Sequence, residues 1–149
     1  MMAGRCICTC IAAVLASAAG ADSIQLDPFA RATSGLASCP AAQPRVYTNE
    51  EAGTQAHARS ERGTRCAMEG TCEPGGAYRR DPEINEAVRA AVAGEKRFAD
   101  TSVWVTTSRR WVTLEGCVKS KVQRATLVKF VGRQPRVERV FDSLTVVSR

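Results

Sequence analysis

The strongest constraint on the fold is a succession of apolar periodicities that begins at Asp81. Asp81-Pro82 indicates the start of a helix, because an Asp N-cap accepts unpaired backbone amides and Pro suits the first helical position. Apolar residues then recur at helical spacing until Gly94, a typical stop. The pattern predicts an amphipathic helix whose apolar stripe comprises Ile84, Ala87, Val88, Ala91 and Val92.

Two runs with a period of two follow this helix and predict a β-hairpin. Residues 103–106 and 111–115 alternate, and they are rich in the β-branched and aromatic side chains that strands favour. Four apolar residues share one face if Ser108-Arg109 forms the turn, although neither residue favours a positive φ and a longer turn is allowed. This register pairs Val105 with Val112 and Val103 with Leu114.

A second helix and a last strand complete the pattern. Ser120 and Gln123 have capping-box spacing, and Gly132 followed by Pro135 ends the helix. The order α-β-β-α-β predicts an α+β fold with one three-stranded mixed sheet and two helices on one face. The helix stripe comprises Val122, Ala125, Val128 and Val131, and the strand, from about Val137 to Val147, buries Val140, Leu144 and Val146.

Residues 1–21 have the composition of a secretory signal peptide. Arg5 is their only charged residue, an apolar run extends from Cys6 to Ala19, and the segment ends in Ala-Gly-Ala. The run is shorter than the ~20 residues of a permanent membrane span. We expect cleavage after Ala21. A weaker alternative is lipidation at Cys39, because residues 36–39 look like a lipobox but do not directly follow the apolar run.

Residues 22–80 contain few, scattered large apolar residues and predict a mostly irregular extension tethered by disulfides. Their one helical signal covers about residues 49–60, where Thr48 and Glu51 have capping-box spacing but only alanines form an apolar face. The segment is electrically balanced, with seven bases and seven acids, whereas residues 81–149 hold thirteen bases and eight acids. The excess positive charge therefore belongs to the second half of the chain.

Four cysteines remain after removal of the signal peptide, and an even number in an exported protein predicts two disulfides. Cys66 and Cys72 are close enough in sequence to close a local loop, which leaves Cys39 to pair with Cys117. The main alternative joins Cys39 to Cys66 and Cys72 to Cys117. By strand parity, Cys117 lies on the sheet face away from the helices, so either pairing ties the extension to that face.

Trp104 and Trp111 are diagonal neighbours on this helix-free face in the predicted register. We interpret them as packing residues beneath the extension, which a Cys39–Cys117 bond would draw over them together with Val46 and Tyr47. The alternative is an exposed aromatic patch for a lipid or a partner.

Several segments of residues 81–148 match one family pattern. They are the Asp-initiated first helix, Val103-x-Val105, Val112-Thr113-Leu114-Glu115-Gly116-x-Val118, Ser120, Arg124 and Ala125 in the second helix, and Val137-x-x-Val140-x-x-x-Leu144-x-Val146. Together they resemble the BON domain. Two turns depart from the family, which usually has Gly or Asn at the hairpin tip and Gly before the last strand. Here these positions hold Ser108, Arg109, Arg110 and Arg136.

The resemblance implies a periplasmic or envelope module without catalytic residues. Such modules are proposed to bind phospholipid or to support envelope integrity and stress survival. The family has no invariant site motif, so the resemblance assigns no functional residue, and the extension lies outside it.

Six bases and no acid lie between Gly116 and Val137. They form either a solvated face or a surface for anionic lipid, where each base contributes ~1 kcal/mol at best, screened within a Debye length. Nucleic acid is not expected, because the chain is exported and Phe130 is the only aromatic residue in this stretch. The candidate residues are Lys119, Lys121, Arg124, Lys129, Arg133 and Arg136.

No arrangement of residues predicts catalysis, a cofactor or a metal. The gap between Cys66 and Cys72 exceeds zinc-ligand spacing, and a thiol at Cys117 that faces His57 would be oxidised after export. We therefore expect a periplasmic, non-enzymatic module that binds anionic lipid and contacts the membrane only peripherally. The alternative is a protein-interaction or structural subunit of an envelope assembly.

Overall fold

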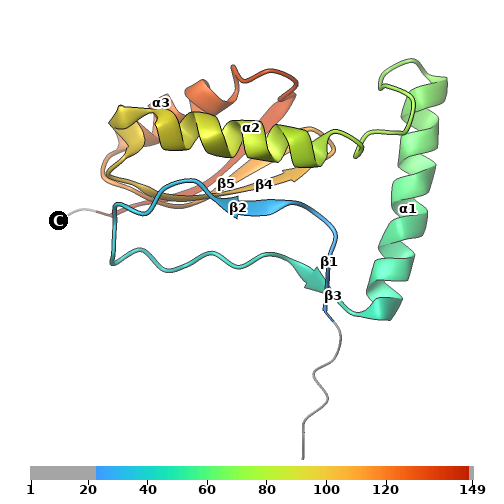
Figure 1. Cartoon of the computed structure of the whole chain (residues 1–149), viewed down its shortest axis with the longest axis horizontal. Helices are drawn as coiled ribbons and strands as arrows, with labels where there is room; N and C mark the ends of the chain where they lie inside the picture. Colours follow the sequence, from blue (N-terminus) through green and yellow to red (C-terminus); the bar gives the residue numbers. More distant parts are fainter. Residues whose placement is uncertain (1–22, 148–149) are drawn as a thin grey trace, which may run out of the picture.

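The computed structural model describes residues 23–147, and it arranges them as two helices over one face of a sheet, with a third helix standing at the end of the sheet (Figure 1). The predicted signal peptide lies outside the described residues. In chain order the elements are β1 (Ile24–Gln25), β2 (Phe29–Arg31), β3 (Val46–Tyr47), α1 (Asn49–Met68), α2 (Asp81–Gly94), the 3-10 turn η1 (Lys96–Phe98), β4 (Ser102–Ser108), β5 (Trp111–Val118), α3 (Lys121–Val131) and β6 (Arg139–Val146).

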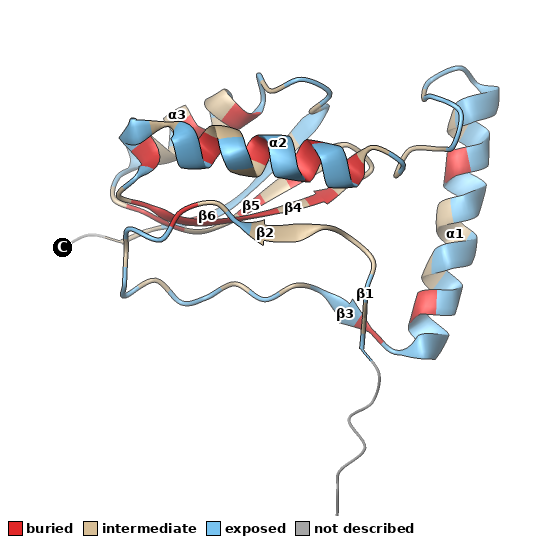
Figure 2. Ribbon diagram, viewed as in Figure 1, coloured by how far each residue is buried: buried red, intermediate tan, exposed pale blue. Residues whose placement is uncertain are grey.

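The predicted α-β-β-α-β order is confirmed by α2, β4, β5, α3 and β6. β4 and β5 pair antiparallel, β6 pairs parallel to β5, and both α2 and α3 cover the same face (Figure 1). The core lies between these layers, where Figure 2 shows the buried faces of α2 and β4 turned toward each other. Phe98, Leu114 and Leu127 are fully buried there. Helical and strand periodicity thus placed most of the core correctly, but Ala87, Val122 and Ala125 of the predicted helix stripes are exposed, and Leu127 is buried although it was in neither stripe.

The sheet has four strands, not the three that we predicted, because β2 of the extension pairs antiparallel with β4. Backbone hydrogen bonds continue on both sides of β2, from the Thr107 amide to the Pro28 carbonyl (3.2 Å) and from the Gly35 amide to the Thr101 carbonyl (2.7 Å). The extension therefore covers the whole outer edge of β4. Its three-residue strand has no alternation long enough to be recognised in the sequence.

A buried amide joins this added strand to the helical layer. The Asn85 side chain of α2, which is 3% exposed, donates to the carbonyls of Pro28 and Val105 (both 3.0 Å) and to the Thr107 hydroxyl (3.1 Å). A buried polar group is costly unless it is hydrogen-bonded. One of its three acceptors, the Pro28 carbonyl, belongs to the extension, so Asn85 links the extension to both α2 and β4.

The hairpin register differs from our prediction by two residues. Val105 pairs with Leu114 and Thr107 with Val112, which leaves Arg109-Arg110 as a two-residue turn. Both arginines have positive φ, 60° and 64°, as a type I′ turn requires. A shift of two residues keeps each side chain on its face, so the apolar pattern alone does not distinguish the two registers.

The Asp81 carboxylate stabilises this turn. We had predicted that Asp81 caps α2, and this prediction is wrong. Arg80 is the N-cap and makes no side-chain capping bond, whereas Asp81 is the first helical residue. Its two carboxylate oxygens accept hydrogen bonds from the amides of Arg109 (2.7 Å) and Arg110 (2.8 Å). The interaction holds a turn whose residues do not favour its conformation.

Burial is the largest influence on the Asp81 carboxyl and raises its pKa, against the two amide hydrogen bonds, which lower it. The folded protein therefore takes up this proton at a higher pH than the unfolded chain. Ionisation of the buried carboxyl therefore costs stability once the pH has risen through the raised pKa, and this cost is absent below the ordinary pKa of 3.8, where the group is protonated in both states.

The extension is less irregular than predicted, because α1 continues to Met68. The predicted capping box between Thr48 and Glu51 is confirmed. Ala52 and Gly63 are its buried residues, so α1 has no apolar stripe of the usual kind. It packs instead through a close backbone approach, since a Cβ at Gly63 would lie 3.3 Å from the Gly76 Cα.

Two disulfides tether the extension in the pairing that we favoured, Cys39–Cys117 and Cys66–Cys72. Cys117 lies opposite Ser102 without a bulge, although Gly116 before it has a φ of 116°. A Cβ at Gly116 would lie 2.1 Å from the Ser102 carbonyl oxygen, so only glycine allows β4 and β5 to approach there.

The two disulfides are expected to differ in their effect on stability. In the chain-entropy model the Cys39–Cys117 bond, which spans 78 residues, contributes about 4–5 kcal/mol, and the six-residue Cys66–Cys72 loop about 2 kcal/mol. Urea unfolding of the two double-serine variants, each compared with the oxidised parent, measures this order. Equal losses in the two variants would contradict it.

Replacement Asp81→Asn is expected to destabilise the fold by about 1–3 kcal/mol, because an amide has one acceptor oxygen for two buried N–H groups. Glu83→Gln is the matched control, since Glu83 makes an exposed ion pair with Arg80 from the same helical turn. Chemical denaturation should show a large loss for the first variant and almost none for the second. Similar losses in both would rule out a special role for Asp81.

Candidate functional site

Two of the six predicted anion-binding bases are already neutralised in the structure. The Lys119 ammonium lies 2.9 Å from the Asp100 carboxylate, and the Arg124 guanidinium lies 2.7 Å from that of Asp142. The hydrogen bond from Lys119 is the largest of the effects that lower the pKa of the Asp100 carboxyl. Lys119 and Arg124 therefore join elements of the domain and present little free charge to a ligand.

Three of the other bases are exposed on α3 or just after its end, and we name this surface the α3 basic face. It consists of Lys121, Lys129 and Arg133 with Val122 between them, and none of these bases makes an ion pair within residues 23–147. Val122 is 77% exposed, not buried as its place in the predicted stripe required. This face combines positive charge with an apolar side chain, as surfaces that rest on lipid do.

Arg136 does not belong to the α3 basic face. It precedes β6 with a φ of 65°, and it lines a small cavity of about 160 Å³ together with Arg80 and Arg110. Arg109, Arg110 and Arg136 are the non-glycine residues of positive φ among those that the structure describes. They occupy the hairpin turn and the turn before β6, where Gly and Asn are the residues that adopt a positive φ most readily.

The two tryptophans are not the diagonal neighbours that the predicted register made them, and they do not form one exposed aromatic patch, which was the alternative interpretation. Trp104 pairs with Glu115 and Trp111 with Ser108, so they lie far apart along the hairpin. Trp104 is only 5% exposed and lies beneath the guanidinium of Arg31 at 5.0 Å. Our packing interpretation holds for Trp104, but the residue that lies over it is Arg31 of β2. Val46, which we expected there, is half exposed.

Trp111 instead belongs to a partly exposed cluster at the start of β5. Its ring meets that of Phe141, which is 41% exposed, edge to face at 5.7 Å. The guanidinium of Arg109 lies 4.0 Å from the centre of the Trp111 ring, and that of Arg139 lies at 5.1 Å. Cation–π contact of this kind holds the guanidinium planes while their edges remain free to donate.

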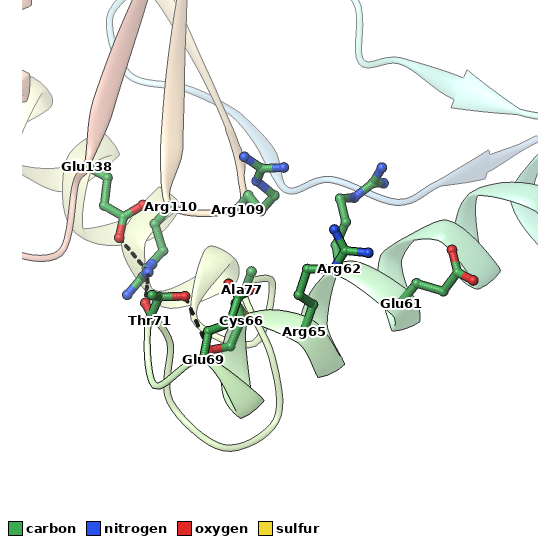
Figure 3. Close-up of a pocket in the computed structure, with 10 residues that line it drawn as sticks. All are labelled: Glu61, Arg62, Arg65, Cys66, Glu69, Thr71, Ala77, Arg109, Arg110 and Glu138. Atoms are coloured by element: carbon green, nitrogen blue, oxygen red, sulfur yellow. Dashed lines mark hydrogen bonds and ion pairs between the residues drawn. The ribbon is translucent and has the colours of Figure 1, made fainter.

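A pocket of about 480 Å³ opens between α1 and the β4–β5 turn (Figure 3). Arg62 and Arg65 of α1 and Arg109 and Arg110 of the turn contribute four guanidinium groups to it. Arg110 is engaged, because it pairs with the Glu138 carboxylate and donates to the Thr71 carbonyl (3.1 Å). We name the other three, Arg62, Arg65 and Arg109, the arginine pocket.

Sequence reasoning missed the arginine pocket because two of its residues lie in the supposedly irregular extension. Arg62 and Arg65 are three residues apart, so continuing the capped helix past Ser60 would have placed them on one face. The unusual tip residue Arg109 was noticed as a departure from the family, but its direction depends on a register that the sequence does not specify.

Within residues 23–147, no helix has the length and apolar character needed to cross a membrane. Nor do His, Cys, Asp and Glu side chains of that part gather in a group of three or more that could hold a metal ion.

Comparison with known proteins assigns the second half of the chain. A family model described as BON domain matches residues 80–148, while no curated protein matches the chain. The matched segment begins at the N-cap of α2 and ends after β6. β2, α1 and three of the four disulfide cysteines, Cys39, Cys66 and Cys72, lie outside it.

The exposure of the two tryptophans is directly measurable. In Trp104→Phe the remaining Trp111 should be quenched readily by acrylamide, whereas in Trp111→Phe the remaining Trp104 should be protected because it is only 5% exposed. Circular dichroism confirms that each variant is folded. Equal quenching of the two variants would contradict the burial of Trp104.

Proposed function

Residues 80–148 form a BON domain, and from this we propose that the protein is an exported, non-enzymatic module that adsorbs to anionic phospholipid of the bacterial cell envelope through the α3 basic face. BON domains are associated with phospholipid and with the envelope. A role in envelope integrity or stress survival would follow from this adsorption.

The observation that carries the proposal is the free charge on α3. Lys121, Lys129 and Arg133 are exposed and make no ion pair with the described residues, while Val122 between them is 77% exposed. At ~1 kcal/mol for each base near an anionic surface, three bases give weak adsorption that falls with salt. Partial burial of Val122 adds up to about 1.5 kcal/mol.

The two disulfides support the proposed export. Disulfides persist in oxidising compartments such as the bacterial periplasm and are rare in the cytosol. Cys39–Cys117 ties the extension to the domain and Cys66–Cys72 closes a loop within the extension, so the protein is expected to reach its stable form after translocation. The periplasm is accordingly the proposed location.

A second candidate function is favoured by β6, which is the outer strand of the sheet on the side away from β2. Its eight residues leave one edge unpaired within residues 23–147, and Phe141, one of them, is 41% exposed. An unpaired edge can accept a strand of another protein. The protein would then serve as an interaction or structural subunit of an envelope assembly.

Charge reversal on the α3 basic face tests the first candidate. Lys121→Glu, Lys129→Glu and Arg133→Glu together should weaken co-sedimentation with phosphatidylglycerol-containing vesicles at least about tenfold, since each base contributes ~1 kcal/mol. Arg124 is left unchanged because its ion pair with Asp142 is part of the fold. The thermal midpoint should stay close to that of the parent.

The control variant carries the same change in net charge elsewhere, as Arg45→Glu, Arg79→Glu and Lys96→Glu, all exposed residues outside α3. It should lose far less adsorption than the α3 variant. Equal losses in the two would show that total charge and not the α3 basic face drives binding. No adsorption of the parent at low salt would favour the second candidate.

A further inference from the structure

We propose that the arginine pocket, Arg62, Arg65 and Arg109, is a binding site for a phosphate monoester group. The site lies between α1 and the β4–β5 turn, apart from the α3 basic face (Figure 1, Figure 3). It joins the extension to the BON domain, because α1 precedes the matched residues and the turn lies within them. It therefore goes beyond the general adsorption proposed above.

The charges around the pocket leave three guanidinium groups for a ligand. Arg62, Arg65 and Arg109 make no ion pair with a carboxylate of residues 23–147. Three guanidinium groups that meet at one opening without a counter-charge repel each other, and an anion between them relieves this repulsion.

The carboxylates that also line the pocket are directed elsewhere. Glu138 pairs with Arg110, and Glu61 lies 3.3 Å from His57, one helical turn earlier. Figure 3 shows Glu61 pointing away from the hairpin and Glu69 beside Thr71, on the side of Arg110. The space between Arg62, Arg65 and Arg109 therefore keeps its positive charge.

Two of the three arginines are held in place before any ligand arrives. The Arg62 Nε donates to the Tyr78 hydroxyl (2.9 Å), which leaves its terminal NH groups free. Arg109 stacks on Trp111 at 4.0 Å, at a turn whose amides are bound by Asp81. Such fixed side chains lose less conformational entropy on binding than mobile ones, so they favour a specific site.

The chemistry of the pocket favours a phosphate monoester over other anions. The planar guanidinium fork matches two phosphate oxygens, and a terminal phosphate offers three oxygens and up to two negative charges. A volume of about 480 Å³ exceeds what a bare phosphate occupies and falls among ordinary ligand pockets, so the group it takes carries an organic substituent. A diester such as phosphatidylglycerol has one charge and fewer free oxygens.

The Cys66–Cys72 disulfide belongs to the frame of this pocket. Cys66 lines it, and the short loop that the bond closes carries Thr71, whose carbonyl accepts from Arg110. The bond thus fixes the end of α1 against the turn that bears Arg109. Experiments on the site therefore use the oxidised, full mature chain.

Two forms of the same chemistry are compared in the test. Glycerol 3-phosphate is the soluble probe, and isothermal titration calorimetry measures its binding. The lipid probe is phosphatidylcholine vesicles that contain phosphatidic acid. They are compared with phosphatidylglycerol vesicles of equal surface charge. We expect saturable binding of the soluble probe, preference for phosphatidic acid vesicles, or both. A soluble ligand alone indicates a free metabolite-type monoester, and a vesicle preference indicates a lipid headgroup.

The variants are chosen to remove charge without disturbing the fold. Arg62→Gln with Arg65→Gln changes two exposed residues of α1, and Arg109→Asn introduces a residue that tolerates positive φ in the type I′ turn. Each variant should weaken binding of both probes about tenfold or more, because charge-assisted bonds to phosphate are lost. Lys121→Gln with Lys129→Gln, an equal loss of charge on α3, should leave binding of glycerol 3-phosphate unchanged.

The outcomes separate this proposal from the one on α3. The absence of saturable glycerol 3-phosphate binding together with equal adsorption to both vesicle types would overturn the arginine pocket, as would variants that bind like the parent. Adsorption of Arg62→Gln/Arg65→Gln to phosphatidylglycerol vesicles should persist, because it depends on α3. If only the α3 variant loses adsorption to phosphatidylglycerol vesicles, the result supports the function proposed for the α3 basic face and does not contradict the proposal for the arginine pocket.

Discussion

The buried Asp81 carboxylate is the interaction on which the arrangement of the second half of the chain depends. It binds both amides of the β4–β5 turn and so fixes the start of α2 against the hairpin. Two arginines with positive φ are held there, one directed to the pocket beside α1 and the other to Glu138. Because burial raises the pKa of Asp81, this link is formed at an energetic cost that the two amide bonds partly offset.

The helices and the core of residues 81–147 could be predicted because their signals are redundant. For α2, the apolar spacing and Gly94 indicated the same helix. For α3, Ser120 and Gly132 marked the two ends, and the structure confirms both helices. The role of Asp81 was misjudged because an acidic residue before Pro has the same appearance as an N-cap. The hairpin register was wrong because a shift of two residues preserves the apolar face, and only the turn conformation separates the alternatives.

The extension was predicted poorly for a different physical reason. β2 has three residues and is held by hydrogen bonds to β4 and to Asn85, none of which leaves a periodic signal. α1 is stabilised by its capping box and by polar contacts such as the ion pair between Arg59 and Asp27 (2.6 Å), not by an apolar stripe. The favoured disulfide pairing is nevertheless confirmed, because the short Cys66–Cys72 loop closes locally, although strand parity did not distinguish this pairing from the alternative.

The candidate site was predictable only in part, because sequence shows where charges are but not which of them are paired. Lys119 and Arg124 belong to the basic run, yet they neutralise Asp100 and Asp142. Lys121, Lys129, Arg133 and Arg136 are the ones left exposed, and the first three belong to the α3 basic face. The arginine pocket combines residues more than forty positions apart in the chain, so its existence depends on how α1 stands against the hairpin.

The strand that the extension adds to β4 limits how copies of this protein can associate. With that edge covered from Thr101 to Thr107, the outer strands of the four-stranded sheet are the three-residue β2 and the eight-residue β6. The longer edge is that of β6, and a two-fold pairing of β6 with β6 leaves nothing on this edge for a third copy to bind. Sheet extension through β6 would then end at a closed dimer, and fibre growth by this route is blocked.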